Sequence, residues 1–156
     1  MKLTNVLSFN FVQTVDKKNK DGFCIIKYSK KIFCEYGGSN KKIIVSNGKS
    51  LVIKIENSGN YYIYPLKKTP LELLLDKEYL ISKILTLEPK YINDKFVTFK
   101  IFNNDNKINI FFDKKNFNLV GWQTEDIYQN ITTTFISSIK INHAVDDEIF
   151  ILPVND

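Results

Sequence analysis

The chain has 156 residues, of which 44% are hydrophobic and 25% charged, which fits one folded domain and excludes extended disorder. Its net charge of +5 comes from lysine alone, because the sequence contains no arginine. Lysine lacks the planar fork that binds phosphate or guanine at two points, and many of these lysines stand in pairs within predicted turns, so a nucleic-acid binder is disfavoured. No apolar run is long enough for a membrane-spanning helix. No secretory signal is recognisable at the start, so an exported protein would have carried its signal ahead of Met1.

Alternating apolar and polar residues predict strands through the first 66 residues. A short helix at 3–7 comes first, and a polar, lysine-rich turn at 16–21 follows the opening strand. Asn47 and Gly48 form a typical two-residue hairpin signal. The predicted strands are 8–15, 22–28, 32–36, 42–46, 51–55 and 61–66.

The pattern changes at Thr69 and Pro70, which read as an N-cap and a first helical residue. Helices are predicted over 70–76 and 78–85, and a helical turn at 146–150 before a last short strand. Strands return at 91–92, 96–102, 107–113, 119–125 and 130–142. Many strands joined by short turns predict a mainly β fold, with one large curved antiparallel sheet and a helical lid over its concave hydrophobic face.

Few residues in the chain offer chemistry. Cys24 and Cys34 lie in adjacent predicted strands, where they form either a disulfide or two free thiols in the core. His143 is the only histidine, and two thiols with one imidazole are too few for a closed zinc site. No nucleophile elbow, phosphate loop or metalloprotease motif is present. We therefore predict no catalytic residue, no metal and no cofactor.

An ordered set of segments covers nearly the whole chain: 11–15 (Phe-Val-Gln-Thr-Val), 43–49 (Ile-Ile-Val-Ser-Asn-Gly-Lys), 64–66, 69–71 and 73–75, then 121–122, 132–135, 145–146 and 150–153. This set resembles the LolA family of outer-membrane lipoprotein carriers, and Tyr-Pro-Leu followed by Thr-Pro-Leu is similar to its α-proteobacterial members. The resemblance implies a single carrier domain over 1–156, folded as an incomplete β-barrel with helices over the open side.

The resemblance also implies a function: a periplasmic chaperone, not an enzyme, that serves outer-membrane biogenesis. Such a carrier binds lipoprotein acyl chains, takes them as a monomer from an inner-membrane ATP-driven releasing complex, and delivers them to an outer-membrane acceptor. The first alternative is the outer-membrane lipoprotein acceptor or another lipid-binding module of the same fold. An enzyme acting on lipid or glycan and a lysine-rich nucleic-acid binder are the further alternatives.

Two sets of site residues follow. The family holds its empty state closed with an arginine before a proline; the aligned pair here is Tyr28 and Ser29, so Tyr28 is the candidate for holding the lid, with Lys27 or Lys30 as substitutes. Thirteen apolar residues are expected either to line the acyl cavity or to pack as plain core under the lid. They are Phe11, Ile53, Ile55, Ile63, Leu71, Leu74, Leu75, Phe99, Ile101, Ile110, Phe112, Trp122 and Phe135.

Overall fold

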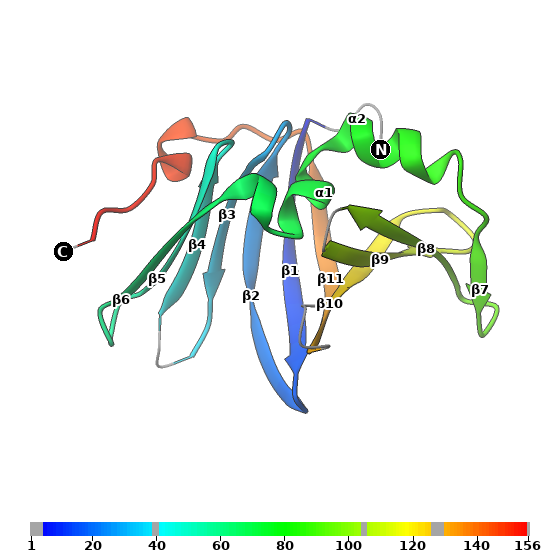
Figure 1. Ribbon diagram of the computed structural model, residues 1–156, viewed down its shortest axis with the longest axis horizontal. Helices are drawn as coiled ribbons and strands as arrows, with labels where there is room; N and C mark the ends of the chain where they lie inside the picture. Colours follow the sequence, from blue (N-terminus) through cyan, green and yellow to red (C-terminus); the bar gives the residue numbers. More distant parts are fainter. Residues whose placement is uncertain (1–4, 39–40, 104–105, 126–129, 156) are drawn as a thin grey trace.

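Eleven antiparallel strands form one open, curved sheet in this computed structural model, which describes residues 5–38, 41–103, 106–125 and 130–155 (Figure 1). The strand order is β6-β5-β4-β3-β2-β1-β11-β10-β9-β8-β7, so the two halves of the chain meet where β1 pairs with β11. The predicted mainly β, single-sheet fold is confirmed. The strands are β1 Val6–Val15, β2 Lys18–Lys27, β3 Lys31–Tyr36, β4 Lys42–Asn47, β5 Ser50–Ile55, β6 Asn60–Pro65, β7 Lys90–Ile92, β8 Phe96–Asn103, β9 Asn106–Asp113, β10 Leu119–Glu125 and β11 Ile131–Ile141.

Two local predictions near the N-terminus are wrong. Of the helix predicted at 3–7, residues 3 and 4 lie outside the described residues, and Val6 and Leu7 instead begin β1, where both join the ladder with β2. The predicted turn at 16–21 contracts to Asp16 and Lys17, whose φ angles of 48° and 65° are both positive. Two successive positive φ angles give a tight turn whose twist suits a hairpin, so β2 begins already at Lys18.

The segment between β6 and β7 crosses the concave face of the sheet, because these two strands are its opposite edges (Figure 1). It contains a 3₁₀ turn, η1 (Leu66–Lys68), and two helices, α1 (Leu71–Leu75) and α2 (Lys77–Ile84). Pro70, rather than Thr69, occupies the N-cap position of α1, and Asp76 caps α2 by accepting a hydrogen bond from the Tyr79 amide at 3.1 Å. We call residues 66–84 the lid. None of the helices in the described part of the chain is long and apolar enough to cross a bilayer.

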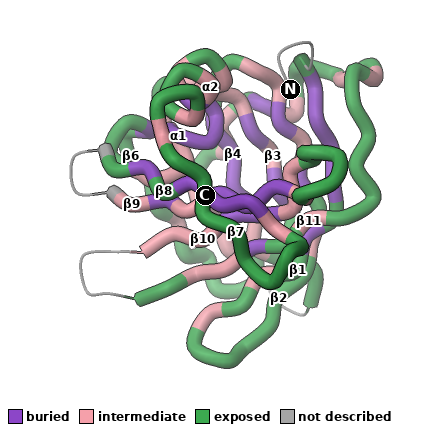
Figure 2. Tube along the Cα trace, turned by 90° about the vertical axis from the view of Figure 1, so that its right-hand side faces the viewer, coloured by how far each residue is buried: buried purple, intermediate pink, exposed green. Residues whose placement is uncertain are grey.

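The C-terminal segment packs on the other face of the sheet. Its 3₁₀ turn η2 (Asp147–Phe150) contacts β3 and β4, and Phe150 is buried there. Beyond it, the Tyr61 hydroxyl donates to the Pro153 carbonyl at 3.0 Å, and residues 151–155 form no strand, contrary to the prediction. Figure 2 shows the buried residues within the strands and the lid, while the turns at the strand ends are exposed. The main core therefore lies between the sheet and the lid.

Candidate functional site

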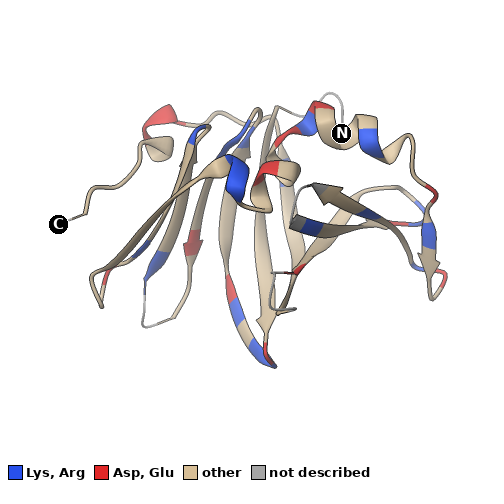
Figure 3. Ribbon diagram, in the orientation of Figure 1, with Lys and Arg blue, Asp and Glu red and all other residues tan. Residues whose placement is uncertain are grey.

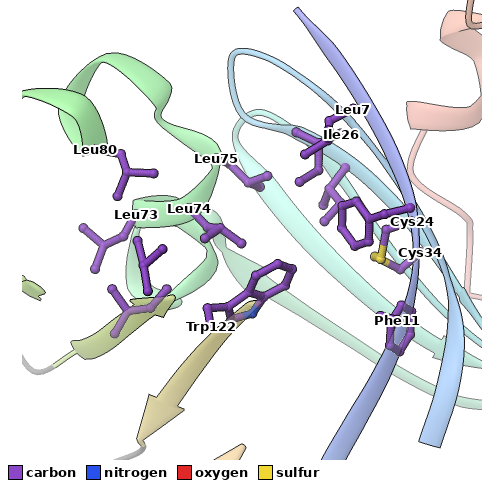
Figure 4. Packing of buried hydrophobic residues seen from close by; sticks show 14 of the residues in the cluster. Leu7, Phe11, Cys24, Ile26, Cys34, Leu73, Leu74, Leu75, Leu80 and Trp122 are labelled. Carbon is purple, nitrogen blue, oxygen red and sulfur yellow. A yellow bond between two sulfur atoms is a disulfide. The ribbon is translucent and has the colours of Figure 1, made fainter. Parts of the chain in front are cut away.

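The leucines of α1 fill the concave face of the sheet. Leu73, Leu74 and Leu75 are 2%, 1% and 0% exposed. Figure 4 shows Leu74 and Leu75 pointing from the lid toward Trp122 and the inward side chains of β1 and β2, while Leu73 lies on the side of Leu80. A helix of five residues is too short to be stable by itself, so α1 is held in place by this packing. The concave apolar surface is thus covered by a small element whose own stability is low.

A small cavity remains under the start of the lid. Its volume is about 140 Å³, and Pro70 and Leu71 of the lid face Phe11, Ile44 and Trp122 of the sheet across it. An engineered protein cavity of about 150 Å³ holds one benzene molecule, so this space holds roughly six carbon atoms. A long acyl chain therefore fits beneath the lid only if the lid leucines move.

Hydrogen-bonded polar side chains form part of the lining of this cavity. The Tyr36 hydroxyl donates to Gln13 Oε1 at 3.0 Å, and Gln13 Nε2 donates to the Thr134 hydroxyl at 3.2 Å, which links three strands. Burial raises the pKa of Tyr36, so its side chain stays neutral. These polar lining groups are thus paired and uncharged.

A disulfide joins Cys24 and Cys34, which stand directly opposite each other on β2 and β3. Their Cα atoms are 4.1 Å apart, and both side chains line the small cavity. Of the two alternatives left open by the sequence, the structure therefore has the bridge and not the free thiols. Disulfides form and persist in oxidising compartments.

Lys30, in the turn between β2 and β3, makes polar contacts to α1 and to Asp76, which follows it. Its amide donates to the Leu75 carbonyl at 3.0 Å. Its ammonium lies 3.6 Å from Glu72 Oε1 and 3.9 Å from Asp76 Oδ2. The Ser46 hydroxyl fixes this turn by donating to the Lys30 carbonyl at 2.9 Å. Figure 3 shows lysines and carboxylates on the lid and at the strand ends, with few along the central strands.

Tyr28, the predicted lid contact, does not act through its hydroxyl. Among the described residues that hydroxyl has no hydrogen-bond partner, and burial raises the pKa of Tyr28 to about 12. Its ring instead lies beneath the lid residue Lys77, whose ammonium is 5.4 Å from the ring centroid. The substitute Lys27 pairs with Asp147, away from the lid. The remaining substitute, Lys30, is the one that contacts α1.

Most of the thirteen predicted cavity residues lie in the core between the sheet and the lid. Ile53 and Leu71 are partly buried against this core, and Ile55 borders a separate hollow beside Tyr36 and Lys42. The residues in the buried core cluster are Phe11, Leu74, Leu75, Phe99, Ile101, Ile110, Phe112 and Trp122.

Two predicted cavity residues, Ile63 and Phe135, face away from this core and are 56% and 45% exposed. The prediction that these positions on β6 and β11 face the concave side of the sheet is wrong. Phe135 stacks on Phe111 across Gly121, with ring centroids 6.0 Å apart and planes 19° from parallel. Gly121 has no room for a side chain, since a Cβ there would lie 2.2 Å from the Thr134 carbonyl oxygen.

Several core residues were missed from the sequence. Leu7 and Phe9 alternate with Phe11 along the same strand, so they could have been predicted to face the same side of the sheet. Leu73 adjoins the predicted Leu74 on the lid. The missed residues include Leu7, Phe9, Ile26, Ile32, Leu51, Leu66, Leu73, Leu80 and Ile108.

Comparison of the sequence with known protein families identifies the family of this chain. The sequence model of the family described as "Outer membrane lipoprotein carrier protein LolA" matches residues 2–152. This chain belongs to the LolA family. The order of the matched segments along the sequence had already indicated this, and the confirmed lid and open sheet are features of the LolA fold.

Solved structures agree on the LolA-type fold at very low identity. A LolA superfamily protein from Nitrosomonas europaea superposes with a TM-score of 0.53 at 9% identity, covering 96% of this chain and 91% of its own. An uncharacterised conserved protein from Thermus thermophilus superposes with a TM-score of 0.57 at 6% identity, and the match covers 97% of this chain and 87% of its own. A DUF1329 family protein from Desulfovibrio piger has a TM-score of 0.52 at 5% identity, and the match covers 95% of this chain and 90% of its own. No curated protein sequence matches the chain significantly.

Proposed function

We propose that this LolA-family chain is a periplasmic chaperone that binds lipoprotein acyl chains between the concave sheet and the lid. In this role it is a monomer without catalytic residues. It takes lipoproteins from an inner-membrane ATP-driven releasing complex and delivers them to an outer-membrane acceptor. The observation that carries the proposal is the burial of Leu73, Leu74 and Leu75 on an apolar sheet face by a helix of only five residues. The Cys24–Cys34 disulfide supports the periplasm as the compartment.

The energetics favour exchange between lid leucines and cargo. Burying one leucine stabilises by about 1.5–3 kcal/mol, so the three α1 leucines contribute roughly 5–9 kcal/mol to the closed state. Each cargo methylene contributes about 0.8 kcal/mol, so roughly ten methylenes offset the loss. Because the cargo's acyl chains replace the lid leucines against the sheet, the net affinity for cargo stays far below the value expected if the acyl chains were buried with no leucines to displace. A carrier needs such an intermediate affinity in order to release its cargo.

The test is the variant Leu74→Glu. Leu74 packs in the core between lid and sheet. With cargo in that space, a carboxylate at this position would face the acyl chains, and a carboxylate surrounded by hydrocarbon costs several kcal/mol. We expect binding of a synthetic triacylated lipopeptide, measured by fluorescence, to be lost, while far-UV circular dichroism retains the strand signal. Leu85→Glu is the matched control, since Leu85 follows α2 and is 75% exposed. Unimpaired lipopeptide binding by folded Leu74→Glu would overturn the lid assignment.

A further inference from the structure

A second apolar groove opens beside the lid, at the ends of β1, β11 and β10. Its volume is about 360 Å³, and none of the described residues that line it is charged. Leu7 and Phe112 form its inner wall and belong also to the main core. Tyr28, beneath the lid residue Lys77, stands on one side. The groove is therefore continuous with the covered core but open to solvent.

A β-bulge in β11 turns two isoleucines toward this groove. The pairs Asn10–Ser137 and Ser8–Lys140 leave one extra residue in β11, and Ser138 there has a φ of 54°. Bulges re-aim the side chains that follow them. Ile136 packs against the core, and Ile139 and Ile141 line the groove beyond the bulge. Without the extra residue, Ile136 and Ile139 would face opposite sides of the sheet.

A second bulge in the neighbouring strand acts in the same direction. Leu119 pairs with Phe112, whereas Gly121 pairs with Phe111, so β10 also carries one extra residue. As a result Leu119 and Trp122 both face the core side. Two bulges in adjacent strands thus direct apolar side chains into one groove.

The groove keeps large apolar side chains in contact with water. Ile139, Ile141 and Phe117 are 41%, 59% and 51% exposed. Phe117 has a φ of 58°, a strained conformation for an aromatic residue, and stacks on Phe112 with ring centroids 4.7 Å apart. Exposed apolar clusters occur at ligand grooves among other interaction sites, and strained residues cluster at functional sites.

We propose that this groove binds one saturated acyl chain of the cargo while the lid is still closed. The inference rests on the proposed function and adds a subsite outside the covered cavity. Scaled from the benzene-sized cavity, 360 Å³ holds roughly fourteen carbon atoms, which is close to one fatty acyl chain. Because Leu7 and Phe112 are shared with the core, a chain seated here extends inward once the lid leucines move.

The test uses palmitate carrying a photoreactive diazirine. We expect its crosslinks, mapped by tandem mass spectrometry, on Leu119, Ile139 and Ile141. The double variant Ile139→Ser/Ile141→Ser is expected to weaken palmitate binding at least about tenfold. Ile131→Ser is the matched control on the same strand, since Ile131 is 46% exposed and lies outside the groove. Equal palmitate affinity in the double variant and the control, or crosslinks confined to α1, would overturn the inference.

The triacylated lipopeptide separates this inference from the proposed function. If the wild type binds lipopeptide, Leu74→Glu does not, and the groove variant binds palmitate normally, the groove assignment fails and the carrier function stands. If the wild type binds neither lipopeptide nor palmitate, both fail.

Discussion

Truncating a lid leucine should tighten cargo binding while it destabilises the protein. Leu75 is completely buried, and its carbonyl accepts the hydrogen bond from Lys30. Leu75→Ala keeps that backbone contact but removes most of the buried side chain. Because Leu75 lies on the lid, we expect the loss to fall on the closed state and to raise the population of the open state.

The magnitude follows from core truncations, in which a buried leucine changed to alanine costs about 2–5 kcal/mol. Each 1.4 kcal/mol taken from the closed state raises the apparent affinity about tenfold, until the open form dominates. The shorter alanine side chain also touches the cargo less, which offsets part of this gain. We therefore expect the Kd for a triacylated lipopeptide to fall by at least about tenfold, although Tm also falls.

The assay pairs Leu75→Ala with Ile108→Ala. Ile108 is equally buried in the same core but lies on β9 and not on the lid, so its truncation should lower Tm without tightening binding. Lipopeptide titrations by fluorescence and thermal melts on both variants give the comparison. If Leu75→Ala loses stability as Ile108→Ala does and shows no gain in affinity, the lid does not compete with cargo.

Three further predictions concern the groups around the site. Ser46→Ala leaves the Lys30 carbonyl without its buried donor, and we expect urea unfolding to show a loss of about 1–3 kcal/mol; an unchanged unfolding free energy would contradict this. Reducing the Cys24–Cys34 bridge should cost about 2–4 kcal/mol, which thermal melts with and without reductant will measure; equal Tm values would exclude it. Burial lowers the pKa of Lys42 in the folded protein below that in the unfolded chain. As pH rises toward the ordinary lysine pKa, the folded protein therefore loses this proton before the unfolded chain does, and wild-type stability should rise. Lys42→Met should be more stable at pH 7 and lack that rise; a less stable variant at pH 7 would refute it.

The sheet and the lid could be predicted because their signals are local. Alternation located most strands, Asn47 and Gly48 marked a hairpin, and Pro70 marked the start of α1 within one residue. The facing of individual side chains was harder to predict. Phe135 and Ile139 share a parity on β11 but lie on opposite sides of the sheet, because the bulge at Ser138 shifts the phase between them. A bulge of one residue leaves no clear mark in a sequence where apolar residues occur at both parities.

The contacts that hold the lid depend on tertiary placement. Alignment with the family selected Tyr28 by position, yet it is the neighbouring turn residue Lys30 that contacts α1. Ser46, on a third strand, orients that turn, so its role could be seen only once β3 and β4 were paired. The disulfide likewise depended on register, which places Cys24 directly opposite Cys34 and which sequence alone does not fix.

Native mass spectrometry of the protein mixed with a triacylated lipopeptide is the most direct test of acyl-chain binding under the lid. We predict a one-to-one complex with the wild type and with Leu85→Glu, and none with Leu74→Glu. A wild-type protein that stays ligand-free, or a Leu74→Glu variant that forms the same complex, would contradict the proposed binding between the lid and the sheet.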